Sequence, residues 1–197
     1  MHMNIPLHHY KYKGWQHIEG YLTRDEVDTI KQIGEQLRIR CSEYSDWKGI
    51  PCASKYSQTL YDMYTSEKMK QLSCQILGDV VYSFNDQIVI KLPGDTLTFE
   101  PHRDNQYGPN SDGSIHTVNL CCILDDITKE NGGLDVKSQD DGQWVELYPK
   151  SGDIIAIQGN TFHRSGRNMT NASRGLYACV YTEQPIHLDG FYTKRIK

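Results

Sequence analysis

The chain has 197 residues, of which 38% are hydrophobic and 23% charged, and its 21 basic and 25 acidic residues give a formal net charge of −4. A chain of this length buries roughly two thirds of the surface that its unfolded form exposes, so we expect one globular domain that needs no structural metal or disulfide. The mildly acidic balance and the lack of long Lys/Arg runs argue against nucleic acid or an anionic membrane as the main partner.

The cysteines and the N-terminus indicate the compartment. Six cysteines occur without any CxxC spacing, which predicts reduced thiols and a cytoplasmic location. Residues 1–13 lack the apolar core of a secretory signal, and no apolar run reaches the roughly 18 residues that a membrane span needs. Asn168 and Asn171 each begin an Asn-x-Ser/Thr pattern, but without an export signal we interpret both as turn residues.

The N-terminal part, about residues 1–78, is predicted to be mainly helical. Thr23 and Glu26 have the spacing of a capping box, and apolar residues follow at the spacing of one helix face. A second helix is predicted from about Ser66 to Leu77, with a glycine as its stop. The sequence leaves the form of Tyr44 to Tyr64 open.

From about residue 79 to 185 the pattern changes to short runs rich in Val, Ile and Tyr, divided by Gly, Asn, Asp and Pro. The predicted strands are residues 80–92, 115–124, 134–136, 144–148, 153–158 and 175–182. Helices followed by many short strands predict an α+β, mainly β chain whose strands form a sandwich or a small barrel. The polar segment 101–114 is too long for a hairpin turn, so we expect a mobile flap there.

A candidate metal site is formed by His102, Asp104 and His163, which lies 163 − 102 = 61 residues after the first histidine. Two imidazoles and one carboxylate suit Fe(II) and leave three positions open for a chelating substrate and O₂. Residues i and i+2 of a strand project to one side, so we expect His102 and Asp104 to reach one metal from a strand. A structural role is the alternative for His163. A second His-x-Asp triplet, at residues 187–189, has too little chain after it to complete a site.

Longer motifs surround these residues: Ile90-Lys91-Leu92-Pro93-Gly94, residues 124–134 (LDDITKENGGL), residues 151–168 (SGDIIAIQGNTFHRSGRN), and an arginine at position 174. In this order they resemble the phytanoyl-CoA dioxygenase family of Fe(II)/2-oxoglutarate oxygenases. The resemblance covers about residues 87–182. It implies a double-stranded β-helix (jelly-roll, cupin-like) barrel with flanking N-terminal helices, as a single domain over residues 1–197. It also implies Fe(II), 2-oxoglutarate as co-substrate, and O₂.

The resemblance also implies roles for individual residues. The iron ligands would be His102, Asp104 and His163. Arg174 would pair with the distal carboxylate of 2-oxoglutarate, for which its forked guanidinium is suited; the alternative is a surface ion pair.

Softer assignments concern the rest of the pocket. Ser165 would add a hydrogen bond to the co-substrate. Three residues would line the co-substrate pocket or merely pack in the barrel wall: Gln87, Asn119 and Cys121. Lys91 could bind the co-substrate, bind the substrate or be solvated, and we place it with Gln106 among the candidate substrate-binding residues.

The implied reaction is hydroxylation of an unactivated C–H bond of a small molecule, an amino acid or a natural-product intermediate, with release of succinate and CO₂. Asp104 favours hydroxylation, desaturation or ring formation over halogenation, because related halogenases replace this carboxylate by Gly or Ala. The alternatives are a hydroxylase of protein or peptide side chains, a non-catalytic binding module, and a metal hydrolase or cupin oxygenase that does not use 2-oxoglutarate.

Two departures from the family concern how the pocket is covered. The interval between the two histidines is short for this family, which predicts an open pocket, or one covered by residues 105–114 and the N-terminal helices. The short chain favours a compact substrate, or a pocket completed by a second subunit in a homodimer.

Overall fold

The computed structural model of the protein describes residues 5–40, 49–106, 110–188, 191–192 and 194–196. The helices are α1 (His8–Lys13), α2 (Arg24–Arg40), α3 (Gln58–Tyr64) and α4 (Glu67–Leu77), with the 3-10 helices η2 (Ala53–Lys55) and η3 (Asp104–Gln106). The strands are β1 (Trp15–Ile18), β2 (Ile50–Pro51), β3 (Tyr82–Lys91), β4 (Phe99–His102), β5 (Thr117–Ile123), β6 (Leu134–Lys137), β7 (Trp144–Leu147), β8 (Ile154–Gln158), β9 (His163–Ser165), β10 (Arg174–Thr182), β11 (His187–Leu188), β12 (Phe191–Tyr192) and β13 (Lys194–Arg195).

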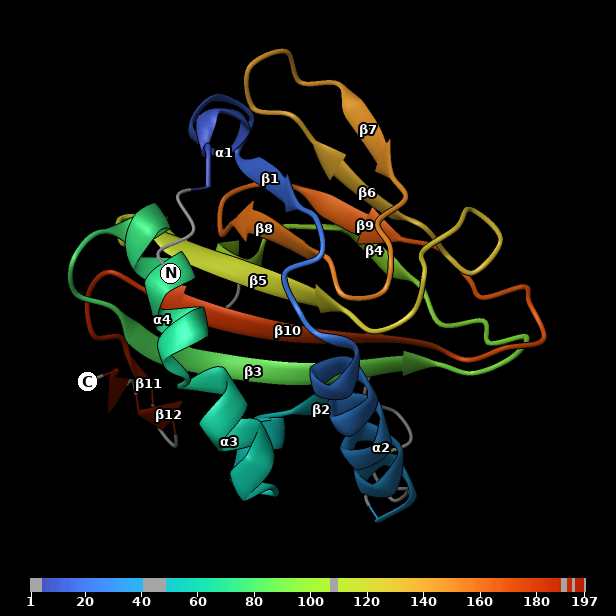
Figure 1. The fold of residues 1–197 in the computed structure, drawn as a ribbon. Coiled ribbons are helices and arrows are strands. Elements are labelled where there is room, and N and C mark those ends of the chain that lie inside the picture. The colour runs from blue at the N-terminus through green and yellow to red at the C-terminus, as the bar shows by residue number, and fades with distance from the viewer. Residues whose placement is uncertain (1–4, 41–48, 107–109, 189–190, 193, 197) are drawn as a thin grey trace.

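Two antiparallel sheets form the body of the molecule (Figure 1). The larger sheet has the order β1-β8-β5-β10-β3-β13, with β2 also paired to β3, and the smaller one has the order β4-β9-β6-β7. Helices α2, α3 and α4 lie against the larger sheet, on the side away from the smaller sheet (Figure 1). The expected α+β, mainly β architecture of double-stranded β-helix type, with helices at the N-terminal end, is therefore confirmed.

Local sequence explains the helix ends. In the capping box before α2, the Thr23 amide donates to Glu26 Oε2 at 2.7 Å and the Glu26 amide donates to Thr23 Oγ1 at 3.2 Å. Ser66 caps α4 by accepting from the Met69 amide at 3.3 Å. Both predicted helices are confirmed.

The N-terminal part contains more than the predicted helices. β1 pairs with β8 and β2 pairs with β3, so this part also supplies two strands to the larger sheet. These strands have only four and two residues, too few for a period-2 pattern to show in the sequence. Within the stretch left open, the structure places β2, η2 and α3, whereas residues 41–48 lie outside the described part.

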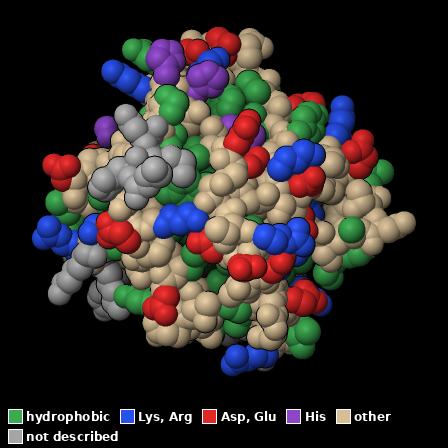
Figure 2. Space-filling model, in the orientation of Figure 1, with side chains coloured by type: hydrophobic (Ala, Val, Ile, Leu, Met, Phe, Trp, Pro, Cys, Tyr) green, Lys and Arg blue, Asp and Glu red, His purple; other side chains and the backbone are tan. Residues whose placement is uncertain are grey.

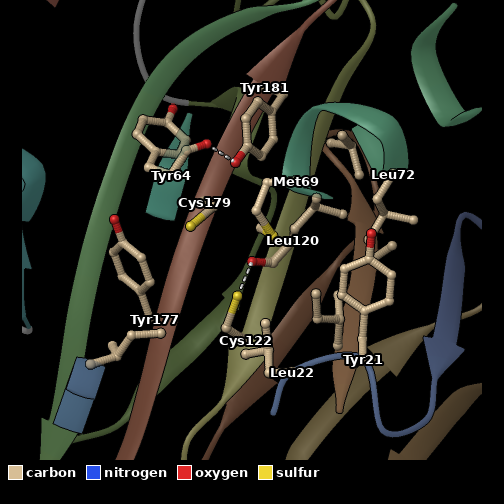
Figure 3. Close-up of a cluster of buried hydrophobic side chains, with 14 of the residues drawn as sticks. Tyr21, Leu22, Tyr64, Met69, Leu72, Leu120, Cys122, Tyr177, Cys179 and Tyr181 are labelled. Carbon is tan, nitrogen blue, oxygen red and sulfur yellow. Dashed lines mark hydrogen bonds between the residues drawn. The ribbon is translucent and has the colours of Figure 1, made fainter. Parts of the chain in front are cut away.

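The two faces of the larger sheet belong to different apolar clusters. Along β10, Tyr177, Cys179 and Tyr181 pack against the helices, whereas Leu176 and Ala178 face the smaller sheet. Figure 3 shows the helix-covered cluster, in which the Tyr181 hydroxyl donates to the carbonyl of Tyr64 at 2.6 Å. This alternation follows from the period of a strand and leaves the second face free to line the space between the sheets.

On the face of the molecule in Figure 2, acidic and basic side chains are interspersed. Among the described residues, no helix combines the length and the apolar character that crossing a membrane requires.

Candidate metal centre

The structure brings His102, Asp104 and His163 together at the edge of the space between the two sheets. One ligand atom from each lies within 4.8 Å of the others. Asp104 Oδ1 is 4.0 Å from His102 Nε2 and 3.5 Å from His163 Nε2. His102 and His163 are directly paired residues of the adjacent strands β4 and β9, with ring centroids 4.2 Å apart. The sequence therefore identified three side chains that converge on one point.

Each histidine is oriented by a carbonyl two residues before it. His102 Nδ1 lies 2.7 Å from the carbonyl oxygen of Glu100, and His163 Nδ1 lies 3.1 Å from that of Thr161. A carbonyl only accepts, so each Nδ1 donates to it, and each ring turns its Nε2 toward Asp104. Both rings thus present Nε2 to the point where Asp104 also ends, which is the orientation that metal binding through Nε2 needs.

Asp104 does not lie on a strand, contrary to the expectation from His-x-Asp spacing. β4 ends at His102, and Asp104 is the first residue of η3. The pairing of β4 with β9 is irregular between Phe99 and His102, where Pro101 has no amide hydrogen to donate. The chain turns after His102, and this turn brings the carboxylate to the two imidazoles.

The donor set fits an iron ion. Two imidazole nitrogens and one carboxylate oxygen are the ligands of the facial triad of non-haem Fe(II) oxygenases, which leaves the remaining positions for other ligands. The second triplet cannot be compared with it, because Asp189 lies outside the described residues.

Arg174 is buried at the start of β10, with 2% of its surface exposed, so it is not a surface ion-pair partner. Its Nη2 donates to the carbonyl of Gly133 at 3.1 Å, whereas its buried Nε has no hydrogen-bond partner among the described residues. Burial lowers the pKa of Arg174 to about 10, so it stays charged at neutral pH. A buried guanidinium with an unused donor is suited to binding an acidic group.

Lys91 is the direct β3 partner of Arg174 and is fully buried, which excludes the solvated alternative. Its Nζ donates to Ser165 Oγ at 2.8 Å and to the carbonyl of Gly166. A side chain on Gly132 would enter this corner, because its Cβ would lie 2.7 Å from the Gly166 carbonyl oxygen and 3.2 Å from Lys91 Nζ. Two cations and a serine hydroxyl therefore meet at one end of the barrel.

Three of the four remaining candidates lie on the larger sheet and the fourth in η3. Gln87 is half-buried on β3 and Cys121 is buried on β5, both on strands of the larger sheet. Asn119 lies on the same face of β5 as Cys121, and its Nδ2 donates to Asp104 Oδ2 at 3.0 Å. Gln106 follows Asp104 in η3, where its Oε1 accepts from the Arg103 amide at 3.1 Å.

Cys121 connects the two parts of the site. Burial raises the pKa of its thiol well above the ordinary value, the negative charge of Asp104 raises it further, and the positive charge of Arg174 opposes these effects. The thiol thus lies within electrostatic reach of both Asp104 and the buried guanidinium.

The sequence analysis did not predict the short strands β4 and β9 or the role of the carbonyls of Glu100 and Thr161. The available signal was that each carbonyl belongs to the residue two positions before a histidine.

A family model described as phytanoyl-CoA dioxygenase (PhyH) matches residues 10–176. No curated protein gives a significant match. The chain is similar in fold to the non-haem alpha-ketoglutarate-dependent carbocyclase SnoK from nogalamycin biosynthesis, with a TM-score of 0.77, 16% identity, and coverage of 95% of this chain and 94% of that one.

Two further solved structures were determined with ligands of interest. The epimerase SnoN in complex with Fe³⁺, alpha-ketoglutarate and nogalamycin RO gives a TM-score of 0.73 at 16% identity, covering 89% of this chain and 81% of that one. EvdO2 from Micromonospora carbonacea var. aurantiaca, complexed with 2-oxoglutarate, gives a TM-score of 0.73 at 15% identity, and the match covers 91% of this chain and 90% of that one. Together with the His-Asp-His cluster, the family match shows that the chain belongs to the phytanoyl-CoA dioxygenase family and is a 2-oxoglutarate-dependent non-haem iron oxygenase.

Proposed function

We propose that this oxygenase hydroxylates an unactivated C–H bond of a small molecule and releases succinate and CO₂. The observation that carries the proposal is the convergence of His102, Asp104 and His163 in a barrel that also holds the buried, incompletely bonded Arg174. When bound, iron together with 2-oxoglutarate and O₂ supplies an oxidant able to attack such a bond. The residues of the chain would hold these components in an arrangement in which they can react.

The metal would be held by three atoms: Nε2 of His102, Nε2 of His163 and Oδ1 of Asp104. The carbonyls behind the two imidazoles prevent the rings from presenting Nδ1 instead. The three donor atoms already point toward one another, and such preorganisation favours tight binding.

The distal carboxylate of 2-oxoglutarate would bind between Arg174, Lys91 and Ser165. The two cations are neighbours across β3 and β10, and their mutual repulsion inside the barrel is relieved when an anion binds. Ser165 already receives a hydrogen bond from Lys91, so its own hydroxyl proton is free to point to a carboxylate. This assignment places Lys91 with the co-substrate rather than with the substrate.

Support for a small-molecule substrate comes from the structural neighbours, among them a carbocyclase and an epimerase of nogalamycin biosynthesis. These enzymes share the fold with this chain at 16% identity. A natural-product intermediate is therefore the substrate class that we favour, and ring formation and epimerisation are the outcomes to be distinguished from hydroxylation.

The test is succinate release from 2-oxoglutarate across a panel of metabolites, with mass spectrometry of the products. A gain of one oxygen atom is expected for hydroxylation; loss of two hydrogen atoms indicates ring formation or desaturation, and an unchanged mass with altered stereochemistry indicates epimerisation. A peptide panel run in parallel tests the protein-hydroxylase alternative. Absence of succinate with every substrate, combined with absence of an anaerobic absorption band with Fe(II) and 2-oxoglutarate, would overturn the proposal.

The variant Arg174→Met separates this function from metal chemistry that does not use 2-oxoglutarate. Loss of a buried charged hydrogen bond costs about 3 kcal/mol, so the concentration of 2-oxoglutarate needed for half-maximal rate should rise on the order of 100-fold. Metal binding in the absence of 2-oxoglutarate should be unchanged. An unaltered 2-oxoglutarate requirement would favour a hydrolase or a cupin-type oxygenase.

A further inference from the structure

The two oxygens of Asp104 have different surroundings. Oδ1 faces both imidazole Nε2 atoms, at 4.0 and 3.5 Å. Oδ2 accepts a hydrogen bond from Asn119 Nδ2 at 3.0 Å. A carboxylate can bind a metal through one oxygen or through both, and the hydrogen bond to Oδ2 selects the first arrangement.

The orientation of the Asn119 amide is in turn determined by its other neighbour. Cys121 Sγ lies 3.5 Å from Asn119 Oδ1 on the same face of β5 and donates to it. Burial raises the pKa of the Cys121 thiol well above its ordinary value, so the thiol keeps its proton. A carboxylate only accepts and a thiol is here the donor, so a flipped amide would lose both hydrogen bonds.

The residue that follows Asp104 is held by the same strand and by the end of β8. Asn105 is 6% exposed, its Oδ1 accepts from Thr117 Oγ1 at 2.7 Å, and its amide donates to the carbonyl of Gly159 at 3.0 Å. Thr117, Asn119 and Cys121 alternate with residues that pack against the helices, so all three polar side chains face the barrel. One face of β5 thus holds both the side chain of Asn105, beside Asp104, and the Asp104 carboxylate.

We propose that Asn119 is a positioning residue that keeps Asp104 a one-oxygen ligand of the metal, and that the thiol of Cys121 sets the orientation of the Asn119 amide. The proposal rests on the proposed function, because it concerns the same metal centre. By holding Oδ2, Asn119 prevents the carboxylate from occupying a second position on the ion, a position that the co-substrate or O₂ requires. Asn119 acts through Asp104 and touches neither substrate nor metal.

The test measures binding of Co(II), a coloured substitute for Fe(II), by titration of the visible absorption of the full chain. Asn119→Leu should weaken Co(II) binding about 10- to 100-fold and alter the absorption spectrum, as loss of a group that supports a ligand does.

Cys121 supplies a graded second test with a matched control. Cys121→Ala should weaken Co(II) binding by a smaller factor than Asn119→Leu does, and Cys121→Ser should restore binding, because a hydroxyl also donates. Cys122→Ala is the control: this neighbouring cysteine faces the helices, so its loss should lower the unfolding free energy without changing Co(II) binding or the spectrum.

The outcomes separate this proposal from the proposed function. If the unaltered protein binds Co(II) and 2-oxoglutarate but Asn119→Leu does so with the same affinity and spectrum, the positioning role is refuted. A higher 2-oxoglutarate requirement with unchanged Co(II) binding would also refute it and would return Asn119 to the co-substrate pocket. If Asn119→Leu does not fold, equal Co(II) binding by Cys121→Ala and Cys121→Ser overturns the assigned role of the thiol. Failure of the unaltered protein to bind either ligand would refute the proposed function itself.

Discussion

The two faces of the larger sheet are built from the same strands but carry different kinds of side chain. The face under the helices is occupied by apolar side chains and tyrosines, among them Tyr181 and Leu120, both fully buried. The barrel face carries an asparagine, a lysine and an arginine that are also buried, beside a smaller apolar cluster. Burial of apolar surface stabilises the first face, whereas burial of polar groups on the second is unfavourable unless each finds a partner.

This difference indicates which face of the sheet binds ligands. On the helix-covered face, tyrosine hydroxyls are bonded within the protein; Tyr64, for example, donates to the carbonyl of Val180. On the barrel face, Arg174 Nε has no partner among the described residues, and Asn119 bonds to Asp104, whose carboxylate faces two histidines of the smaller sheet. Groups that remain incompletely satisfied mark the face that binds ligands.

The sharpest separation of the two faces is expected from His163→Ala. Loss of a metal ligand should weaken Co(II) binding by more than the roughly 100-fold that loss of a supporting group causes, and should abolish succinate formation. His116→Ala, at an imidazole whose side chain is 67% exposed, is the control and should change neither. Metal binding by His163→Ala equal to that of the unaltered protein would place the site elsewhere.

Leu72→Ala tests the opposite face. Leu72 is fully buried on α4 within the helix-covered cluster, so its truncation should lower the unfolding free energy by about 2–5 kcal/mol, measured by urea denaturation. Co(II) affinity of the folded variant should stay unchanged. The control, Met169→Ala, alters a side chain that is 80% exposed and should be nearly neutral. A large loss of metal affinity in Leu72→Ala would show that the two faces are coupled.

Asn168→Ala tests a loop at the end of the barrel that holds Lys91. The Asn168 side chain is fully buried, and its Nδ2 donates to the carbonyls of Lys91, Leu92 and Ala172 at 3.1, 3.0 and 2.8 Å. Its loss should cost about 1–3 kcal/mol of unfolding free energy and weaken 2-oxoglutarate binding. Asn171→Ala, at the exposed asparagine of the second Asn-x-Ser/Thr pattern, should have neither effect. Equal stability of the two variants would contradict the role of Asn168.

The smallest effect is expected in the pH dependence of stability. Burial raises the pKa of Asp86 above its ordinary value, although Ser54 and Tyr177 donate to its carboxylate. The folded protein therefore holds this proton more tightly than the unfolded chain, and the ionised carboxylate destabilises the fold as pH rises from the unfolded to the folded pKa. Asp86→Asn should thus gain stability relative to the unaltered protein as pH rises through this window, measured by urea denaturation at a series of pH values.

Asp126 provides a control of opposite sign for the pH experiment. Hydrogen bonds from the Ser151 amide and from Lys150 lower the pKa of its carboxyl. Its contribution to stability is present above the unfolded pKa and is lost as pH falls through the folded one. Asp126→Asn should therefore lose stability relative to the unaltered protein as pH rises. Parallel curves for the two variants would contradict the opposite shifts of the two carboxyl groups.

The longer strands of the larger sheet, β3, β5, β8 and β10, could be predicted because their signal is local. In β5, apolar residues under the helices alternate with Thr117, Asn119 and Cys121, and the run is long enough for the period to show. β4 and β9 carry the two histidines but have only four and three residues, and β4 contains Pro101. No local sequence pattern therefore predicts these two strands. The candidate ligands were recognised from residue type and spacing, whereas the strands that hold the two histidines were not.

The sequence by itself indicated the class of fold and three candidate ligand side chains, because periodicity and the chemistry of side chains are properties of the chain, and its family resemblance indicated the arginine. Only the tertiary structure decided that Asp104 reaches the metal site from a 3-10 helix, that Lys91 is buried beside Arg174, and that Asn119 bonds to Asp104. These facts depend on the register between distant strands and on the burial that this register produces. The physical reason is that hydrogen-bond partners and desolvation arise between segments, and no single segment encodes them.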